Sequence, residues 1–75
     1  MKIGAGKKLK MKSITLNWMQ SMMTGVIKVI IDETNNLVTL TYIDENQETA
    51  KLTKEEIESG HENVFSFVSA VQSKR

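Results

Sequence analysis

Three β-rich runs separated by two polar turn clusters constrain the fold of this chain more than any other feature. Residues 25–53 read GVIKVIIDETNNLVTLTYIDENQETAKLT. β-Branched residues dominate the first two runs, which is typical of strands. The ETNN and DENQ clusters contain the Asn and Asp residues that favour tight turns. Two close turns in succession predict an antiparallel meander, with strands at about residues 25–32, 37–43 and 48–53.

A further strand is predicted ahead of the meander, at about residues 13–20. Ile14, Leu16 and Trp18 alternate with Thr15, Asn17 and Met19, and this is the period of a half-buried strand. An earlier alternation runs in the opposite phase, so a bulge or a bend is expected near residues 12–13. The strand is therefore either one long kinked element or a short one that begins near residue 13.

Residues 20–25 (QSMMTG) are expected to connect this strand to the next, with Gly25 as the residue of positive φ. Trp18 lies on the more apolar face of its predicted strand and is expected in the core. The nearby methionines are Met19, Met22 and Met23. We expect them to fill gaps under a loop, and an adaptable binding patch at the surface is the alternative.

After residue 53 the pattern changes from strand to helix. Thr53 and Glu56 form the signature of a capping box, which starts a helix predicted at residues 54–59, and Gly60 is suited to end it. Residues 61–73 are predicted to form a second helix because their apolar side chains recur at the spacing of one helix face. These side chains are Val64, Phe67, Val68 and Val71.

The elements together predict a single small α+β domain at residues 9–75, preceded by a basic arm at residues 1–8. The expected architecture is a four-stranded antiparallel meander followed by a short helical turn and a C-terminal helix packed on the sheet. The order of strands also resembles that of SH3-like barrels, including Tudor-type domains, in topology alone. That alternative is a five-stranded barrel whose final strand would be residues 64–71.

The predicted sheet carries more apolar side chains than one amphipathic helix can cover. Residues 26–32 are apolar on both faces, which indicates a central strand covered on both sides. A closed barrel, a second copy of the chain or another protein would cover the surplus. The candidate partner surface consists of Val26, Ile30, Leu37, Ile43 and Phe65.

The composition argues against several kinds of functional site. The chain has no Cys and one His, His61, so neither a thiol nucleophile nor a conventional zinc site is expected. No catalytic, metal-binding, cofactor-binding or small-molecule site is predicted, and the protein is expected not to be an enzyme. No apolar run approaches the length of a membrane span, so we expect a cytoplasmic protein without a membrane partner.

Charge is distributed unevenly along the chain. Residues 1–12 hold five lysines and no acid, whereas the formal net charge of the whole chain is +1. We favour a solubilising terminus as the interpretation of this basic arm. The alternative is an arm that contacts the phosphates of a nucleic acid. The candidate nucleic-acid contacts are Lys7, Lys8, Lys10 and Lys12.

The favoured functional hypothesis is a non-enzymatic binding or adaptor module that acts through an apolar sheet or helix surface. Its expected partner is another protein or a second copy of the chain, because 75 residues bury only a thin core. Monomer and homodimer both remain open, since neither disulfides nor thiolate metal sites can supply extra stability. The alternative function is a small nucleic-acid-binding accessory protein that uses the lysine arm.

Overall fold

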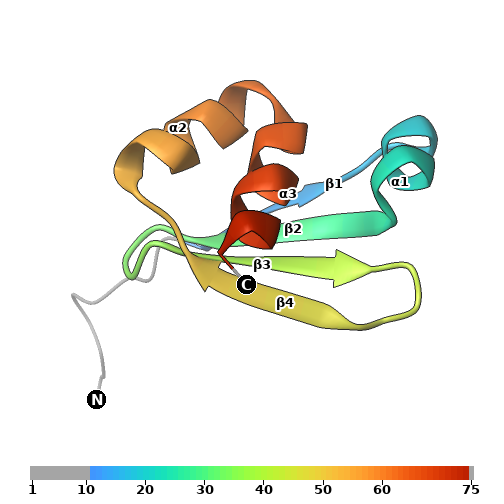
Figure 1. The fold of residues 1–75 in the computed structure, drawn as a ribbon, viewed down its shortest axis with the longest axis horizontal. Coiled ribbons are helices and arrows are strands. Elements are labelled where there is room, and N and C mark those ends of the chain that lie inside the picture. Colours follow the sequence, from blue (N-terminus) through green and yellow to red (C-terminus); the bar gives the residue numbers. More distant parts are fainter. Residues whose placement is uncertain (1–10, 75) are drawn as a thin grey trace, which may run out of the picture.

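The structure of the protein, a computed structural model, describes residues 11–74 and shows an α+β fold. Its elements are β1 (Met11–Thr15), α1 (Trp18–Thr24), β2 (Val26–Asp32), β3 (Leu37–Tyr42), β4 (Gln47–Lys51), α2 (Lys54–Glu62) and α3 (Val64–Ser73). Neighbouring strands pair antiparallel in the order β1-β2-β3-β4 (Figure 1). The predicted four-stranded antiparallel meander with following helices packed on the sheet is confirmed.

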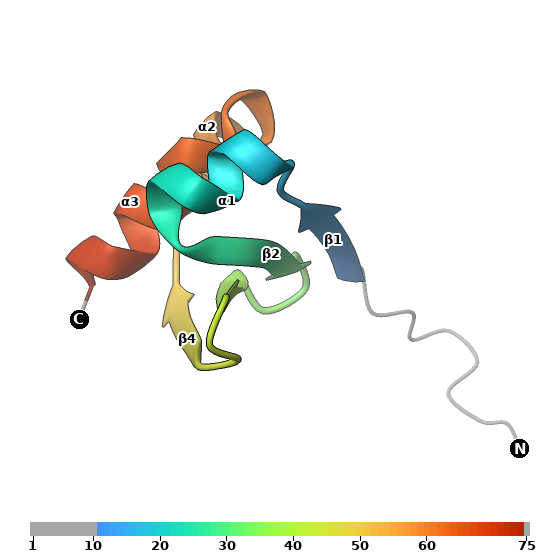
Figure 2. The same ribbon diagram turned by 90° about the vertical axis from the view of Figure 1, so that its right-hand side faces the viewer.

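The described helices all lie on the same side of the sheet (Figures 1 and 2). Within residues 11–74, β1 and β4 each pair along one edge only, so the sheet stays open. Residues 64–71 belong to α3 and not to a fifth strand. The barrel alternative is therefore not adopted, because the apolar side chains of this segment match the period of a helix.

The two hairpin turns owe their shape to local hydrogen bonds that acidic side chains accept from the backbone. Asp32 Oδ1 accepts from the backbone N–H groups of Thr34 and Asn35, at 3.0 and 3.2 Å. Asn36 then adopts a φ of 58°, a left-handed conformation that Asn tolerates. In the β3–β4 turn, Asp44 Oδ1 accepts from the Asn46 backbone N–H at 3.1 Å. Both polar clusters thus form turns, as the sequence predicts.

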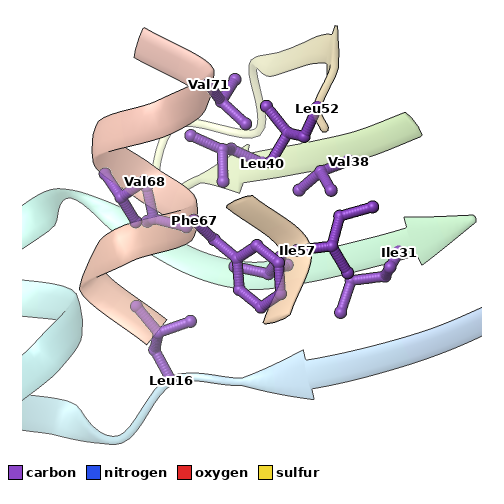
Figure 3. Packing of buried hydrophobic residues seen from close by; sticks show 11 residues of the cluster. Leu16, Ile31, Val38, Leu40, Leu52, Ile57, Phe67, Val68 and Val71 are labelled. Atoms are coloured by element: carbon purple, nitrogen blue, oxygen red, sulfur yellow. The ribbon is translucent and has the colours of Figure 1, made fainter. Parts of the chain in front are cut away.

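The core lies between the sheet and the pair α2 and α3 (Figure 3). Its buried side chains are Leu16, Val26, Val29, Ile31, Val38, Leu40, Leu52, Ile57, Phe67, Val68 and Val71. Burial of each such side chain contributes about 1.5–3 kcal/mol relative to exposure. The apolar stripe predicted for the C-terminal helix supplies three of these residues, so its inward face is confirmed.

Helix α2 begins at the predicted capping box but extends further than predicted. Thr53 Oγ1 accepts from the Glu56 N–H at 3.1 Å, and Glu56 Oε1 accepts from the Thr53 N–H at 2.8 Å. The helix continues through Gly60 to Glu62, so the predicted end near residue 59 is wrong. Asn63 caps the next helix by accepting from the Phe65 N–H at 3.0 Å. Gly60 is thus buried within α2 and does not end it.

A β-bulge in β2 places Val26 on a different face from the one that simple alternation predicts. Val26 pairs with Tyr42, and Lys28 pairs with Thr41, so Ile27 is the extra residue between two consecutive pairs. The extra residue shifts the phase of the strand. Val26 is consequently fully buried, and Ile27 is exposed. The bulge predicted near residues 12–13 is absent, because β1 pairs with β2 without a shift.

The strand predicted at about residues 13–20 is only partly present. β1 ends at Thr15, and residues 18–24 form α1. Trp18 is therefore a helical residue and is 77% exposed, so the prediction that it lies in the core is wrong. Tyr42, by contrast, is half-buried and packs against the core. The Tyr42 hydroxyl accepts from Gln72 Nε2 at 3.1 Å, at the rim of the core.

Candidate functional site

Capping hydrogen bonds fix both ends of helix α1. Asn17 Oδ1 accepts from the Gln20 N–H at 2.8 Å, and Gln20 Oε1 accepts from the Asn17 N–H at 2.9 Å. These reciprocal bonds make a capping box, which satisfies donors at the start of a helix. At the other end Gly25, with a φ of 76°, donates its N–H to Ser21 O at 2.7 Å. The spacing of Asn17 and Gln20 is the sequence signal that could have located this helix.

The large apolar side chains of α1 all point away from the protein. At 3.6 residues per turn they occupy about 140° of the helix circumference. They are Trp18, Met19, Met22 and Met23, with exposed fractions of 77%, 64%, 64% and 71%. We call these four residues the α1 surface. The prediction that the methionines fill gaps under a loop is wrong, and the surface alternative agrees with their exposure.

The polar residues of α1 occupy the opposite, inward side. Gln20, Ser21 and Thr24 are each half-buried. The Thr24 hydroxyl donates to Gln20 O at 2.9 Å and accepts from the Val26 N–H at 3.0 Å, which ties the helix to β2. A helix on a globular protein normally buries its apolar side and exposes its polar side. α1 has the reverse arrangement.

Ile43 and Ile27 lie near the ends of α1 and extend the exposed apolar area. Ile43 is 59% exposed and donates its N–H to the O of Gly25, the residue that caps α1, at 2.9 Å. Figure 1 shows α1 and the β3–β4 turn at the same end of the molecule. Ile27 is 38% exposed, and its O accepts from the Leu16 N–H at 3.0 Å. Neither isoleucine is needed to fill the core.

The residues of the predicted partner surface are scattered over the fold. Val26 is fully buried, so its assignment to a partner surface is wrong. Ile30 and Leu37 are half-buried on the sheet face that carries no helix in the described part of the chain. Phe65 is half-buried on α3, and Ile43 alone is largely exposed. These residues do not form one patch.

Hydroxyl and amide side chains make the helix-free sheet face more polar than expected. The hydroxyls of Thr39 and Thr49 share a hydrogen bond of 2.8 Å across neighbouring strands. Gln47 Nε2 donates to Thr41 Oγ1 at 3.2 Å on the same face. Such cross-strand pairs satisfy one another and need no external partner. Among the described residues, α1 carries four of the seven exposed large apolar side chains, and the others are Met11 on β1, Ile27 on β2 and Ile43 after β3.

The predicted nucleic-acid contacts have little support among the described residues. Lys7, Lys8 and Lys10 lie outside them. Lys12 Nζ lies 3.8 Å from Glu33 Oε2, and a neighbouring carboxylate weakens the attraction of a lysine for phosphate. Residues 13–27, which include α1, contain no charged side chain. The α1 surface is thus not built for the charge-based binding that nucleic acids require.

A shallow depression lies between the β2–β3 turn and α2. Its lining residues are Glu33, Asn36, Lys54, Ile57, Glu58 and His61. His61 Nε2 lies 3.0 Å from Glu33 Oε2, and the His61 ring meets that of Phe67 edge-on at 5.6 Å. These contacts tie α2 to the turn and to the core. Among residues 11–74, no group of three or more potential metal ligands is gathered at one place.

Comparisons with known proteins add no functional assignment. No protein-family model matches the chain, and no curated protein or solved structure matches it significantly. None of the helices within residues 11–74 is both long enough and apolar enough to cross a membrane.

Proposed function

We propose that the protein is a non-enzymatic protein-interaction module that binds its partner through the α1 surface. The observation that carries this proposal is the reversed orientation of α1. Four large apolar side chains face solvent, while Gln20, Ser21 and Thr24 face the protein. An apolar patch that a folded chain keeps exposed marks a contact site for another molecule.

The chemistry of the patch suits a protein partner. Trp18 offers a large flat area, and tryptophan is among the residues that contribute most to protein interfaces. Met19, Met22 and Met23 are unbranched and polarisable, so they adapt to the shape of an apolar partner surface. Asn17, which is exposed at the start of α1, provides a polar group at the edge of the patch. An apolar centre with a polar rim is the usual anatomy of such interfaces.

The energetics also favour a partner-covered surface. Burying a large apolar side chain contributes about 1.5–3 kcal/mol, so a partner that buried all four would add substantially to the free energy of binding. The chain holds α1 in this orientation with caps at both ends and with the Thr24 hydroxyl. Those hydrogen bonds organise the patch before any partner arrives. Preorganisation of this kind lowers the entropic cost of binding.

Site-specific photo-crosslinking in the source cell tests the proposal. A photoreactive residue is placed at position 22, on the α1 surface, or at position 49, on the helix-free sheet face. Met22 and Thr49 are both exposed, so neither replacement should disturb the core. We expect a discrete crosslinked adduct from position 22 and none from position 49. No adduct from position 22, or the same adducts from both positions, would contradict the proposal.

A further inference from the structure

We infer that the partner on the α1 surface is a second copy of this chain, packed against the first about a two-fold axis. The inference rests on the proposed function and names the occupant of the same site. In such a contact the same patch is used twice, so each residue meets its own counterpart or a near neighbour. Three properties of the chain favour this occupant.

The first property is the absence of charged residues in α1 and in the segments that flank it along the chain. Residues 13–27 contain no Asp, Glu, Lys, Arg or His. In a two-fold contact, a charged side chain near the axis would face the same charge on the partner, and like charges at an interface are unfavourable. A surface that binds a different protein has no such restriction and commonly uses complementary charges. The uncharged segment therefore fits a patch that contacts itself.

The second property is the size of the patch. If each large side chain offers roughly 200 Å², the exposed fractions of the α1 surface and Ile43 leave on the order of 600 Å² of mainly apolar area. This is at or above the largest patch of a typical monomer, about 300–600 Å². With the neighbouring polar atoms it approaches the roughly 800 Å² per partner of a standard protein interface. The patch is thus large enough for a specific dimer.

The third property is that α1, although held by its caps and by the Thr24 hydroxyl, buries no side chain in a single copy. The helix has 7 residues and buries none of them, although isolated helices of this length are unstable in water. The chain also has no disulfide to compensate for a thin core. Packing α1 against its counterpart would bury four apolar side chains per copy. Dimerisation would therefore stabilise the element that mediates it.

Other occupants fit the patch less well. A membrane surface is usually bound by a helix with Lys or Arg on its polar side, which attract anionic lipids. The polar side of α1 holds Gln20, Ser21 and Thr24 and faces the protein. A lipid surface therefore finds on α1 none of the basic side chains that attract it. We retain neutral lipid vesicles as an arm of the test.

The single tryptophan provides a direct readout, because Trp18 lies on the α1 surface and the chain has no other Trp. Sedimentation of the full chain from the nanomolar range to about 100 µM should show a shift from the 8.5 kDa monomer to twice that mass. The emission maximum of Trp18 should move to shorter wavelength over the same concentration range. A monomer with unchanged emission at 100 µM would overturn the inference.

A charge exchange at Met22 tests whether α1 forms the contact. Met22→Lys and Met22→Glu should each weaken dimerisation by about tenfold or more, because each places like charges across the axis. An equimolar mixture of the two variants should regain the dimer. Thr49→Lys, on the helix-free sheet face, should dimerise like the wild type. A dimer that persists in both Met22 variants would place the contact elsewhere and overturn the inference.

The outcomes separate this inference from the proposed function. An adduct from position 22 that contains a different protein, with a wild-type chain that stays monomeric, overturns the homodimer and leaves the interaction module intact. A monomer that binds neutral vesicles and gives no protein adduct overturns both. An adduct from position 22 of twice the chain mass, lost in Met22→Lys, supports both.

Discussion

Gly60 packs directly against the ring of Phe67, so closely that a Cβ at position 60 would overlap the ring carbons. Phe67 is fully buried at the centre of the core, and Gly60 lies inside α2. The missing side chain of Gly60 is what allows α2 and α3 to approach each other. The weakest helix former of α2 is therefore placed where the packing requires it.

Gly60→Ala tests this relationship. Alanine normally stabilises a helix interior by about 1 kcal/mol relative to glycine. Here the overlap with Phe67 acts against it, since overpacking a core costs about 1–3 kcal/mol. Because the overlap with the ring is severe, the cost should lie at the upper end of that range, and we expect the free energy of unfolding to fall by up to about 2 kcal/mol, as measured by urea denaturation. An unchanged or increased stability would contradict the close packing.

Ser59→Ala is the matched control for Gly60→Ala. Ser59 is exposed on the same helix, so its replacement should change the free energy of unfolding by no more than about 0.5 kcal/mol. The double variant Gly60→Ala with Phe67→Leu should lose less stability than the sum of the two single variants. Additive losses would show that the two positions do not share the same space.

The bulge in β2 predicts opposite tolerances at two adjacent positions. Val26→Ala should lower the free energy of unfolding by about 2 kcal/mol, because it leaves a cavity in the core. Ile27→Ala should lower it by much less, since Ile27 is the exposed extra residue of the bulge. Thermal or urea denaturation of the two variants measures the difference. The reverse order of effects would mean that β2 alternates without a bulge.

The capping box of α2 predicts a loss of helix stability in Thr53→Ala. The substitution removes the acceptor for the Glu56 N–H, and loss of such a cap costs about 1 kcal/mol. Thr53→Ser retains a hydroxyl at the same position and should restore most of the stability. Equal losses in the alanine and serine variants would indicate that the cap contributes nothing.

Acid should destabilise the protein partly through Glu56. The backbone N–H of Thr53 and the ammonium group of Lys74 lower the pKa of Glu56 below its ordinary value of 4.5. At a pH between the folded and the unfolded pKa of Glu56, the unfolded chain binds a proton and the folded chain does not. The stabilisation that comes from the lowered pKa is therefore complete above about pH 4.5 and is lost as pH falls through the folded pKa. Urea midpoints from pH 6 to pH 3 should fall less steeply in Glu56→Gln than in the wild type.

Asp32 should account for part of the acid sensitivity that remains in Glu56→Gln. Hydrogen bonds from the Asn35 side chain and from the backbone of the β2–β3 turn lower the pKa of Asp32. The sign is therefore the same as for Glu56, and its contribution is lost as pH falls through its folded pKa. A Glu56→Gln variant with the same acid decline as the wild type would contradict the role of Glu56.

The second half of the fold follows from local signals in the sequence. The Asn and Asp residues of the turns form hydrogen bonds with residues close to them in the sequence, as Asp32 does with Asn35. The capping box at Thr53 and the apolar spacing of Phe67, Val68 and Val71 are equally local. Each signal agrees with the tertiary fold, and such agreement makes prediction reliable.

The strand predicted at about residues 13–20 is only partly present because two local signals compete in that segment. Ile14, Leu16 and Trp18 alternate like a strand, whereas Asn17 and Gln20 have the spacing of a helical capping box. The capping box prevails after Thr15, where β1 ends. The candidate site lies in this segment, so the alternation predicts a core position for Trp18, which instead belongs to the exposed α1 surface.

The sequence by itself determined the type and order of the elements from residue 26 onward, their turns and the inward face of α3, because these depend on hydrogen bonds and spacings within one element. Only the tertiary structure decided that Val26 faces inward and that the apolar side of α1 faces outward. The first depends on pairing with β3, where one extra residue reverses the phase of a strand. The second depends on contacts with neighbouring strands, because Leu16, ahead of α1, donates its N–H to Ile27 O, and Gly25, which caps α1, accepts from the Ile43 N–H.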